Sequence, residues 1–543
     1  MIEMKRLGCM ALVAVGLLAG CGGGGGGSSG GGNTPPPPVT ISPVVFKDVT
    51  GSTPADAGLG QPFNVQWVLP ANVTISSVVL DATTKSGANL TTSTCTVTAG
   101  TLAVSATSTD ITIPNLCEGK TVNDVRLRIT VTASDGQTTS ATYPFVTPAA
   151  PAAFLPKRVK LPVLRITTDN GAPIVSRDVY ITGQMSLVSN VAGAPAVNGG
   201  LQIRGRGNST WDIHPKKPYR VKLTDKQPLL GMPSSKDWVL LANHSDKSLL
   251  RNALALDLGA RMGLAWTPRY AFVEVYLNDR YDGVYQLMEN IKVAKDRVNI
   301  DELAAADVGA DKITGGYLLE VDFREDGYTM HTTIDDLPIV FQSPEQPAPE
   351  QETYIKGYIN QFEAVLHSST FTDPTTGYAA YIDVDSFIRY YLVNEVFRNV
   401  DANMWSSCWM YKPRGGKLFM GPLWDFDLAA GNANYADAFK TEGWHIRIAP
   451  WFKRLFEDPA FAARVKTAWI EIKADELPAM FQEITTRSAG LQQAQLNNFQ
   501  RWPILETWVW PNNQIPGSYK GEVDYLRSFL TARIDWIDQQ INK

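Results

Sequence analysis

Two short acidic segments are the strongest candidates for chemistry in this sequence. Residues 399–403 read Asn-Val-Asp-Ala-Asn and residues 424–427 read Trp-Asp-Phe-Asp, so Asp401 and Asp425 both stand beside apolar residues. Carboxylates in apolar surroundings are costly unless they are paired, hydrogen-bonded or bound to a metal. Mg²⁺-dependent phosphoryl transfer needs two such groups, because one orients the acceptor hydroxyl and the other holds the metal on the phosphates.

A glycine-containing segment upstream is a candidate for binding anions. Residues 201–210 read Leu-Gln-Ile-Arg-Gly-Arg-Gly-Asn-Ser-Thr. Gly205 and Gly207 would let the backbone approach a ligand closely, with amides free to bind an anion. No Gly-Lys-Ser/Thr follows, so this is not a Walker A loop, and a tight hairpin is the alternative interpretation. Lys217 comes soon afterwards and is the candidate for a point-charge contact to phosphate.

The elements that must position these segments change in type along the chain. Helices are expected at residues 249–262, with Asp246 or Ser248 as N-cap, and at 385–397, 461–472, 479–491 and 525–541. Strands are expected at residues 163–166, 179–181, 201–203, 219–223 and 316–321, with a hairpin formed by 271–277 and 283–288. Strands first and helices later predict one α+β domain over residues 159–543.

The region before this domain has a different composition. Residues 40–147 are rich in Val, Thr, Ser and Ala, and short alternating runs are separated by turn residues. This pattern predicts an all-β immunoglobulin-like sandwich, for which a spacer role is favoured over a binding role. Residues 148–158, rich in Pro and Ala, are expected to be a linker.

The N-terminus has the features of a targeting segment. A basic pair at Lys5 and Arg6 precedes an apolar stretch that ends Leu-Ala-Gly-Cys21, which resembles a bacterial lipoprotein signal with cleavage before Cys21 and lipidation of that residue. Residues 1–20 are therefore expected to be the signal peptide and residues 21–39 a Gly/Ser/Pro tether. We expect an exported protein anchored by lipid and not spanning the membrane. Gly22 favours the outer membrane if the source is Gram-negative.

Cysteine use fits an exported protein, and the bulk composition argues against several kinds of site. Cys95 and Cys117 are a plausible disulfide within the N-terminal domain, and Cys408 is expected to be a buried structural thiol instead of a reactive one. The net charge is −5, which argues against a nucleic-acid partner. The histidines are scattered without metal-ligand spacing, which argues against a zinc site or a Ser-His-Asp hydrolase.

Six segments occur in an order that resembles the spore-coat CotH kinase-like family. None of the six would suffice alone, and the resemblance extends over about residues 160–540. It implies an atypical protein-kinase-like fold and an enzyme that uses ATP and a divalent metal, Mg²⁺, to phosphorylate proteins. The segments are Arg-Gly-x-Gly-Asn-Ser-Thr at 204–210, Pro-Lys-Lys-Pro-Tyr at 215–219, Lys-Ser-Leu-Leu-Arg-Asn at 247–252, Gly-Val-Tyr-Gln-Leu-x-Glu at 283–289, Asn-x-Asp-x-Asn at 399–403 and Trp-Asp-Phe-Asp at 424–427.

The resemblance also implies roles for individual residues. Asp401 would be the catalytic carboxylate, Asp425 would hold Mg²⁺, and Lys217 would contact the phosphates. Residue chemistry suggests further roles: Glu289 would position Lys217, unless it pairs with Arg251. The remaining candidates are Arg204, Gly205, Gly207 and Asn208 for the nucleotide, and Asn403 and Asp427 for the metal.

Departures from ordinary protein kinases leave the activity open. Asp401 is preceded by Arg-Asn-Val and not by His-Arg, Ser406 stands where a kinase has its metal-binding Asn, and Asp427 replaces the Gly of Asp-Phe-Gly. The expected reaction is phosphorylation of hydroxyl side chains on surface proteins. A non-catalytic assembly or adhesion scaffold, or an adenylyl transferase or ligase on the same fold, are the alternatives, since ATP is scarce outside the cytoplasm.

Overall fold

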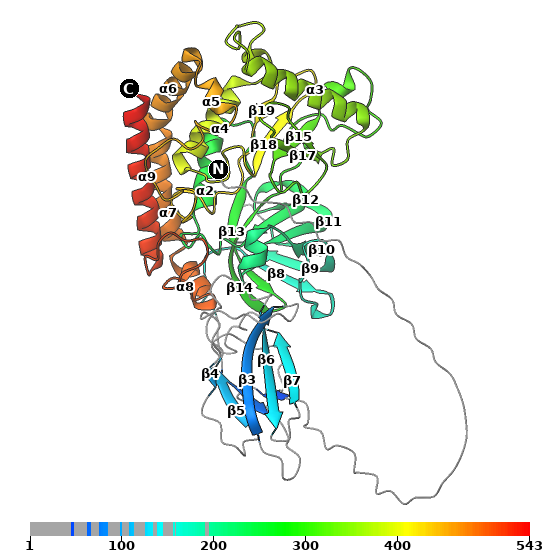
Figure 1. Ribbon diagram of the computed structural model, residues 1–543, viewed down its shortest axis with the longest axis vertical. Helices are drawn as coiled ribbons and strands as arrows, with labels where there is room; N and C mark the ends of the chain where they lie inside the picture. The colour runs from blue at the N-terminus through cyan, green and yellow to red at the C-terminus, as the bar shows by residue number, and fades with distance from the viewer. Residues whose placement is uncertain are drawn as a thin grey trace, which may run out of the picture.

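The computed structural model describes residues 156–157, 159–189 and 195–542, together with the backbones of seven strands between residues 45 and 144. Those N-terminal strands form two antiparallel sheets (Figure 1). The immunoglobulin-like class stays a prediction, and the signal peptide, the tether, Cys21, Cys95 and Cys117 lie outside the described residues. One sheet has the order β1 (Val45–Lys47), β2 (Pro62–Gln66), β5 (Ser108–Thr112), β4 (Thr98–Ala99), and the other has the order β3 (Ile75–Thr84), β6 (Val125–Ala133), β7 (Thr138–Pro144).

The first half of the larger domain is a closed barrel in the order β10-β11-β12-β14-β13-β8-β9. Residues at alternate positions of β10 and β11 point into its apolar interior, as Ile203 and Val221 do. The hairpin predicted around Asn278 and Asp279 is present, and both residues have positive φ. The strands are β8 (Val163–Thr168), β9 (Ile181–Val188), β10 (Val197–Gly205), β11 (Tyr219–Leu229), β12 (Met232–Leu241), β13 (Tyr270–Leu277) and β14 (Arg280–Glu289).

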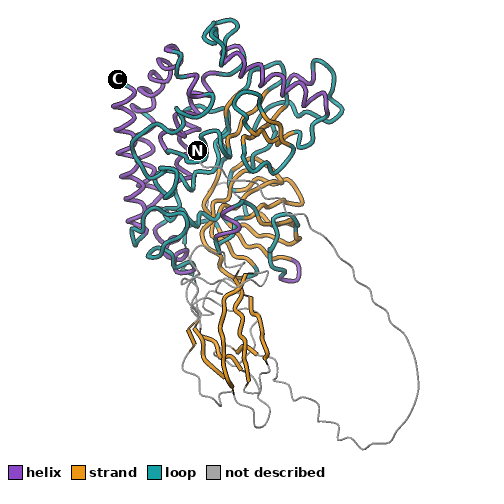
Figure 2. The backbone as a smooth tube through the Cα atoms, viewed as in Figure 1, coloured by secondary structure: helices purple, strands orange, loops and turns teal. Residues whose placement is uncertain are grey.

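A second sheet and most of the helices follow the barrel. Figure 2 shows helices gathered on one side of the strands, with α3 on the far side of the second sheet. The second sheet has the order β16 (Thr329–His331), β17 (Pro338–Ser343), β15 (Tyr317–Val321), β18 (Cys408–Lys412), β19 (Phe419–Met420). The α-helices are α1 (Ser209–Ile213), α2 (Arg251–Arg261), α3 (Pro349–Leu366), α4 (Val384–Phe397), α5 (Phe452–Leu455), α6 (Pro459–Ala474), α7 (Glu476–Gly490), α8 (Gln492–Arg501) and α9 (Tyr519–Ile541), and short 3₁₀ turns lie at Asp169–Gly171, Lys312–Thr314 and Tyr378–Ala380.

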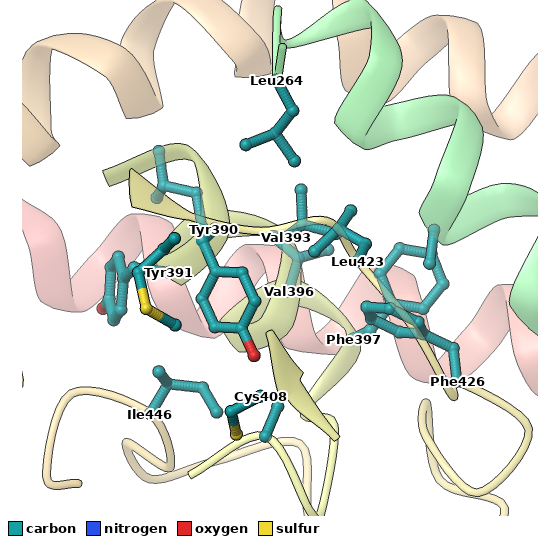
Figure 3. Packing of buried hydrophobic residues seen from close by; sticks show 14 of the residues in the cluster. Leu264, Tyr390, Tyr391, Val393, Val396, Phe397, Cys408, Leu423, Phe426 and Ile446 are labelled. Carbon is teal, nitrogen blue, oxygen red and sulfur yellow. The ribbon is translucent and has the colours of Figure 1, made fainter. Parts of the chain in front are cut away.

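Helix α4 is the centre of the main hydrophobic core. It is buried on nearly all sides: Tyr390 points toward Cys408, and Phe397 packs against Phe426 with ring centres 5.6 Å apart (Figure 3). Leu423 and Phe426, on either side of Asp425 along the chain, are buried in the same core. Helix packing thus fixes both ends of the segment that holds Asp425.

An ion pair joins the C-terminal helix to this core. Arg533 of α9 is fully buried and donates hydrogen bonds to the carboxylate and carbonyl of Glu395 on α4. The same carboxylate accepts from the backbone amides of His445, Ile446 and Arg447 at 2.8–2.9 Å. Glu395 therefore links three separate parts of the chain.

The structure confirms most of the predicted elements and shifts several boundaries. Helix α2 begins at Arg251 and not at 249, because Leu249 has a φ of 62° and the Asp246 carboxylate accepts the Arg251 amide. The strand expected at 179–181 begins only at Ile181. Cys408 is buried as expected, and burial raises the pKa of its thiol to about 12. Within the described part of the chain, no helix combines the length and apolar character needed to cross a bilayer.

Candidate functional site

A cavity of about 1170 Å³ lies against the outer face of the barrel. Its lining comes from β10 and β11, from the segment after β14, from β15 and β18, and from the loops that carry both acidic segments. Of the residues predicted for the site, it brings together Arg204, Gly207 and Asn208 on the barrel side and Asp401, Asp425 and Asp427 opposite them.

The acidic wall of the cavity is formed by Asp401, Asp425 and Asp427 with Glu320 and Asp322. Burial, and after it the negative charge of Asp425, raise the pKa of Asp401 to about 6. Burial and then the charge of Asp425, with which Asp427 also shares a hydrogen bond, raise the pKa of Asp427 well above its ordinary value. Burial and then the charge of Asp322 raise the pKa of Glu320 well above its ordinary value. Carboxylates crowded in this way favour a bound cation or proton.

The loop at Asp425 is held from two sides in an unusual backbone conformation. Asp425 has a φ of 64°, which costs a non-glycine residue on the order of 1–3 kcal/mol. The side-chain oxygen of Asn252 accepts the Phe426 amide at 2.8 Å, and the Asn399 amide donates to the Asp425 carbonyl at 3.2 Å. Arg251 donates to the carbonyl of Ala429 at 3.0 Å, just beyond the loop.

The second half of segment 247–252 therefore acts on the site through the backbone. Asn252 reaches the acidic loop directly, and Arg251 is itself fixed by a buried ion pair of 2.6 Å with Asp246. Because these residues clamp the loop without entering the cavity, their part in the site was not predictable from their residue types.

The basic wall of the cavity lies on the barrel. Arg204 of β10 and Arg220 of β11 are direct cross-strand partners on the outer face, and Lys222 follows Arg220 by two residues on that face. Arg206 lies at the end nearest the carboxylates, with its guanidinium 5.1 Å from the centre of the Trp424 ring. Among the residues that the structure describes, these four cations form no ion pair. Like charges placed directly opposite each other are destabilising, so this wall favours a bound polyanion.

Burial lowers the pKa of Arg206, and the nearby charges of Asp425, Glu320 and Asp427 act in the opposite direction. Arg206 is thus the cation through which the two walls interact. Alternation along β11 already placed Arg220 and Lys222 on one face, opposite the apolar Tyr219 and Val221. That signal would have identified them as candidates.

Four predicted site residues are not among those that line the cavity: Gly205, Lys217, Glu289 and Asn403. The ammonium group of Lys217 donates to the carbonyl of Trp211 and lies 5.4 Å from the centre of that ring. The buried carboxylate of Glu289 forms a two-point contact with Arg269, at 2.8 Å for both hydrogen bonds, and lies 3.8 Å from Arg297. The expected pairing of Glu289 with Lys217 or Arg251 is therefore replaced by pairing with Arg269 and Arg297.

The glycine segment serves packing more than anion binding. The Gly205 amide donates to the Ser176 carbonyl at 2.8 Å, so it is not free, and a side chain at Gly205 would meet the ring of Trp211. The Arg177 guanidinium donates to the Gly207 carbonyl at 2.9 Å and to the Asn208 side chain at 2.6 Å. This segment therefore contributes mainly its arginine side chains to the cavity.

The donor set fits Mg²⁺ shared with a ligand better than a metal held by protein alone. In the described ranges, no group of three or more His, Cys, Asp or Glu residues could hold a metal ion. Mg²⁺ commonly takes one or two carboxylates together with substrate phosphates, and the hydrogen-bonded Asp425 and Asp427 supply such a pair. The side-chain oxygen of Asn403 is buried without a hydrogen-bond partner in the described part of the chain, but Asn403 does not line the cavity.

Comparison with known proteins agrees with this geometry. The profile of the family described as CotH kinase protein matches residues 203–537, which include the loop at Arg204 and both acidic segments. No curated protein matches the chain.

Proposed function

Because the chain belongs to the CotH kinase family, we propose that it transfers the γ-phosphoryl group of ATP to hydroxyl side chains of proteins at the cell surface. The observation that carries the proposal is the opposition of charges across one cavity. Arg204, Arg206 and Arg220 face Asp401 and Asp425, which suits a polyphosphate on one side and a metal-bound reacting end on the other.

In this reaction the acceptor oxygen bonds to the γ-phosphorus, the bond from that phosphorus to ADP breaks, and the hydroxyl proton passes to Asp401. A pKa of about 6 leaves Asp401 mostly ionised at neutral pH and able to accept the proton. Asp425 and Asp427 would hold Mg²⁺, which neutralises charge on the phosphates when bound. Arg206 and Arg220 would hold the polyphosphate in line, so positioning and charge stabilisation supply most of the catalysis.

The proposed setting is the bacterial envelope, with the chain tethered through a lipid on Cys21, in the outer membrane if the source is Gram-negative. Support comes from the N-terminal sequence and the predicted Gly/Ser/Pro tether. The acceptor would be a surface protein. The net charge of −5 argues against a nucleic-acid partner.

Two labels on ATP test this proposal on the full chain. The protein is incubated with Mg²⁺, an extract of envelope proteins and ATP labelled at either the γ- or the α-phosphate. We expect γ-label, but not α-label, on acceptor proteins, and no transfer by Asp425→Asn or Asp401→Asn. Asp524→Asn is the matched control, since Asp524 is exposed on α9 and pairs only with Lys520 in the described structure.

The other outcomes are equally informative. Transfer of α-label would identify an adenylyl transferase on the same fold. If wild type and Asp425→Asn bind Mg·ATP equally poorly, the nucleotide site does not exist, and a scaffold role replaces the enzyme.

A further inference from the structure

The basic wall of the cavity continues along the barrel as a second groove. This groove of about 420 Å³ lies over β9, β10 and β11, which are neighbours in the barrel (Figure 1). Lys222 lines both the cavity and the groove, so the two meet at this side chain. Lys236 of β12 lines only the groove, and its ammonium group donates to the carbonyl of Thr224. The positive charge of the barrel face therefore extends past the candidate site.

Strand register arranges the outer face of the barrel as successive cross-strand pairs. Arg204 pairs with Arg220, and both line the cavity. The next pair on this face is Gln202 with Lys222, and both line the groove. At about 3.4 Å per residue, this second pair lies about 7 Å farther from Arg206 than the first. The groove thus leads directly away from the end of the cavity that carries the carboxylates.

The floor of the groove is left bare by Gly200. This residue lies inside β10, where glycine weakens a strand, and its φ is not positive, so the backbone conformation does not require glycine. A Cβ atom there would come within 2.6 Å of the Thr224 hydroxyl oxygen. The side chains of Gln184 and Gln202 are exposed beside this bare position. Glycine within a strand is typical of a site where a ligand approaches the backbone closely.

We infer that the groove binds inorganic polyphosphate and that the end of this chain, placed in the cavity, is a phosphoryl donor. The inference rests on the proposed function and adds a donor class to it. A linear polyphosphate is charged along its whole length, which matches cations that continue from Arg206 through Lys222 to Lys236. The triphosphate of a nucleotide ends in a nucleoside, which has no charge to offer the farther cations. A donor besides ATP also suits the exported setting that the N-terminal sequence predicts.

The transfer from polyphosphate is the same substitution at phosphorus as the transfer from ATP. The acceptor oxygen bonds to the terminal phosphorus, and the bond from that phosphorus to its bridging oxygen breaks. The hydroxyl proton passes to Asp401, and the leaving group is a polyphosphate shortened by one unit. Lys222 and Lys236 would hold the remainder of the chain, so phosphates beyond the third should increase the affinity.

Calorimetric titration of the full chain with tripolyphosphate or long-chain polyphosphate, both with Mg²⁺, tests the groove. Wild type should bind the long chain at least about tenfold more tightly. Gln202→Glu is nearly isosteric and lies outside the cavity, and it should weaken long-chain binding at least about fivefold through charge repulsion. Lys236→Gln should act in the same direction, and both variants should bind tripolyphosphate within about twofold of wild type. Gln482→Glu, an exposed position on α7, is the control for net charge and should change neither affinity.

Radioactive phosphorus in the polyphosphate tests the donor. The labelled chain is incubated with Mg²⁺, the protein and a dialysed, nucleotide-free extract of envelope proteins, with γ-labelled ATP in parallel. We expect label on acceptor proteins from polyphosphate, less of it with Gln202→Glu and none with Asp401→Asn. If the long chain binds no more tightly than tripolyphosphate, if Gln202→Glu behaves as Gln482→Glu does, or if only ATP donates, the inference is wrong although the proposed function stands. If neither donor labels an acceptor, both the inference and the proposed function fail.

Discussion

The clamp on the acidic loop makes a quantitative prediction for Asn252→Ala. Asn252 is 4% exposed; its oxygen accepts the Phe426 amide at 2.8 Å, and its amide donates to the Asn243 side chain at 3.3 Å. Alanine leaves two buried polar groups without these partners. At about 1–3 kcal/mol for each unsatisfied group, and less for the longer bond, the free energy of unfolding should fall by about 2–4 kcal/mol.

The same substitution should weaken Mg²⁺-dependent nucleotide binding, because Asp425 keeps its left-handed conformation only while the surrounding contacts hold it. Unfolding in urea, followed by tryptophan fluorescence, measures the stability change. Every tryptophan except Trp67 lies at residue 211 or beyond, so this signal reports the larger domain.

Asn360→Ala is the control for the hydrogen bond itself. The Asn360 oxygen also accepts a backbone amide, that of Thr333 at 3.1 Å, but in an exposed position where water replaces it. Its loss should cost no more than about 0.5–1 kcal/mol. Equal stability losses for Asn252→Ala and Asn360→Ala would refute the reasoning that burial of the clamp matters.

Three further predictions concern the charged groups. With a pKa of about 6, Asp401 must lose its proton to act as base, so the transfer rate should fall about tenfold per pH unit below pH 6; a flat single-turnover profile from pH 7 to 5 would exclude this role. Burial, followed by the charge of Lys217, lowers the pKa of His214 to about 3. As the pH falls, the unfolded chain, with a His pKa near 6.5, therefore binds a proton before the folded chain does. This difference at His214 alone should lower the free energy of unfolding by about 2 kcal/mol at pH 5. Urea titrations at pH 7 and pH 5 measure the loss, which should be absent in His214→Asn. Arg206→Gln should weaken Mg·ATP binding at least about tenfold, whereas Lys217→Ala should change it less than about twofold, as measured by calorimetry; the reverse order would restore Lys217 as the phosphate ligand.

How far the sequence predicts this molecule depends on the range of the interactions involved. Helix α4 and the hairpin at Asn278 follow from local periodicity and turn chemistry, and both were predicted. Closure of the barrel was not predicted, because it depends on the parallel pairing of β8 with β13. The paired residues, such as Val163 and Glu274, lie more than 100 positions apart in the sequence.

In the candidate site, too, the residues identified by their local sequence were predicted, and those whose role depends on long-range packing were not. Asp401 and Asp425 were identified from their own segments, and the cavity brings them together. The predicted cation Lys217 lies just before β11, where no strand alternation directs its side chain, and it contacts Trp211 instead of the cavity. Inside β11 alternation does direct Arg220 and Lys222 outward. Their role depends on which surface packs against that face, which only the tertiary structure shows.

The buried pair of Glu395 and Arg533 has a consequence for the order of folding. The two residues are 138 positions apart, so Glu395 lacks its buried cation until α9 docks on α4. A buried carboxylate without its partner costs on the order of 3–5 kcal/mol. The core beneath Asp401 is therefore expected to close only once α9 has docked, and a chain truncated before α9 should lack an ordered site. Docking of the last helix thus sets the earliest moment at which the proposed nucleotide site can form.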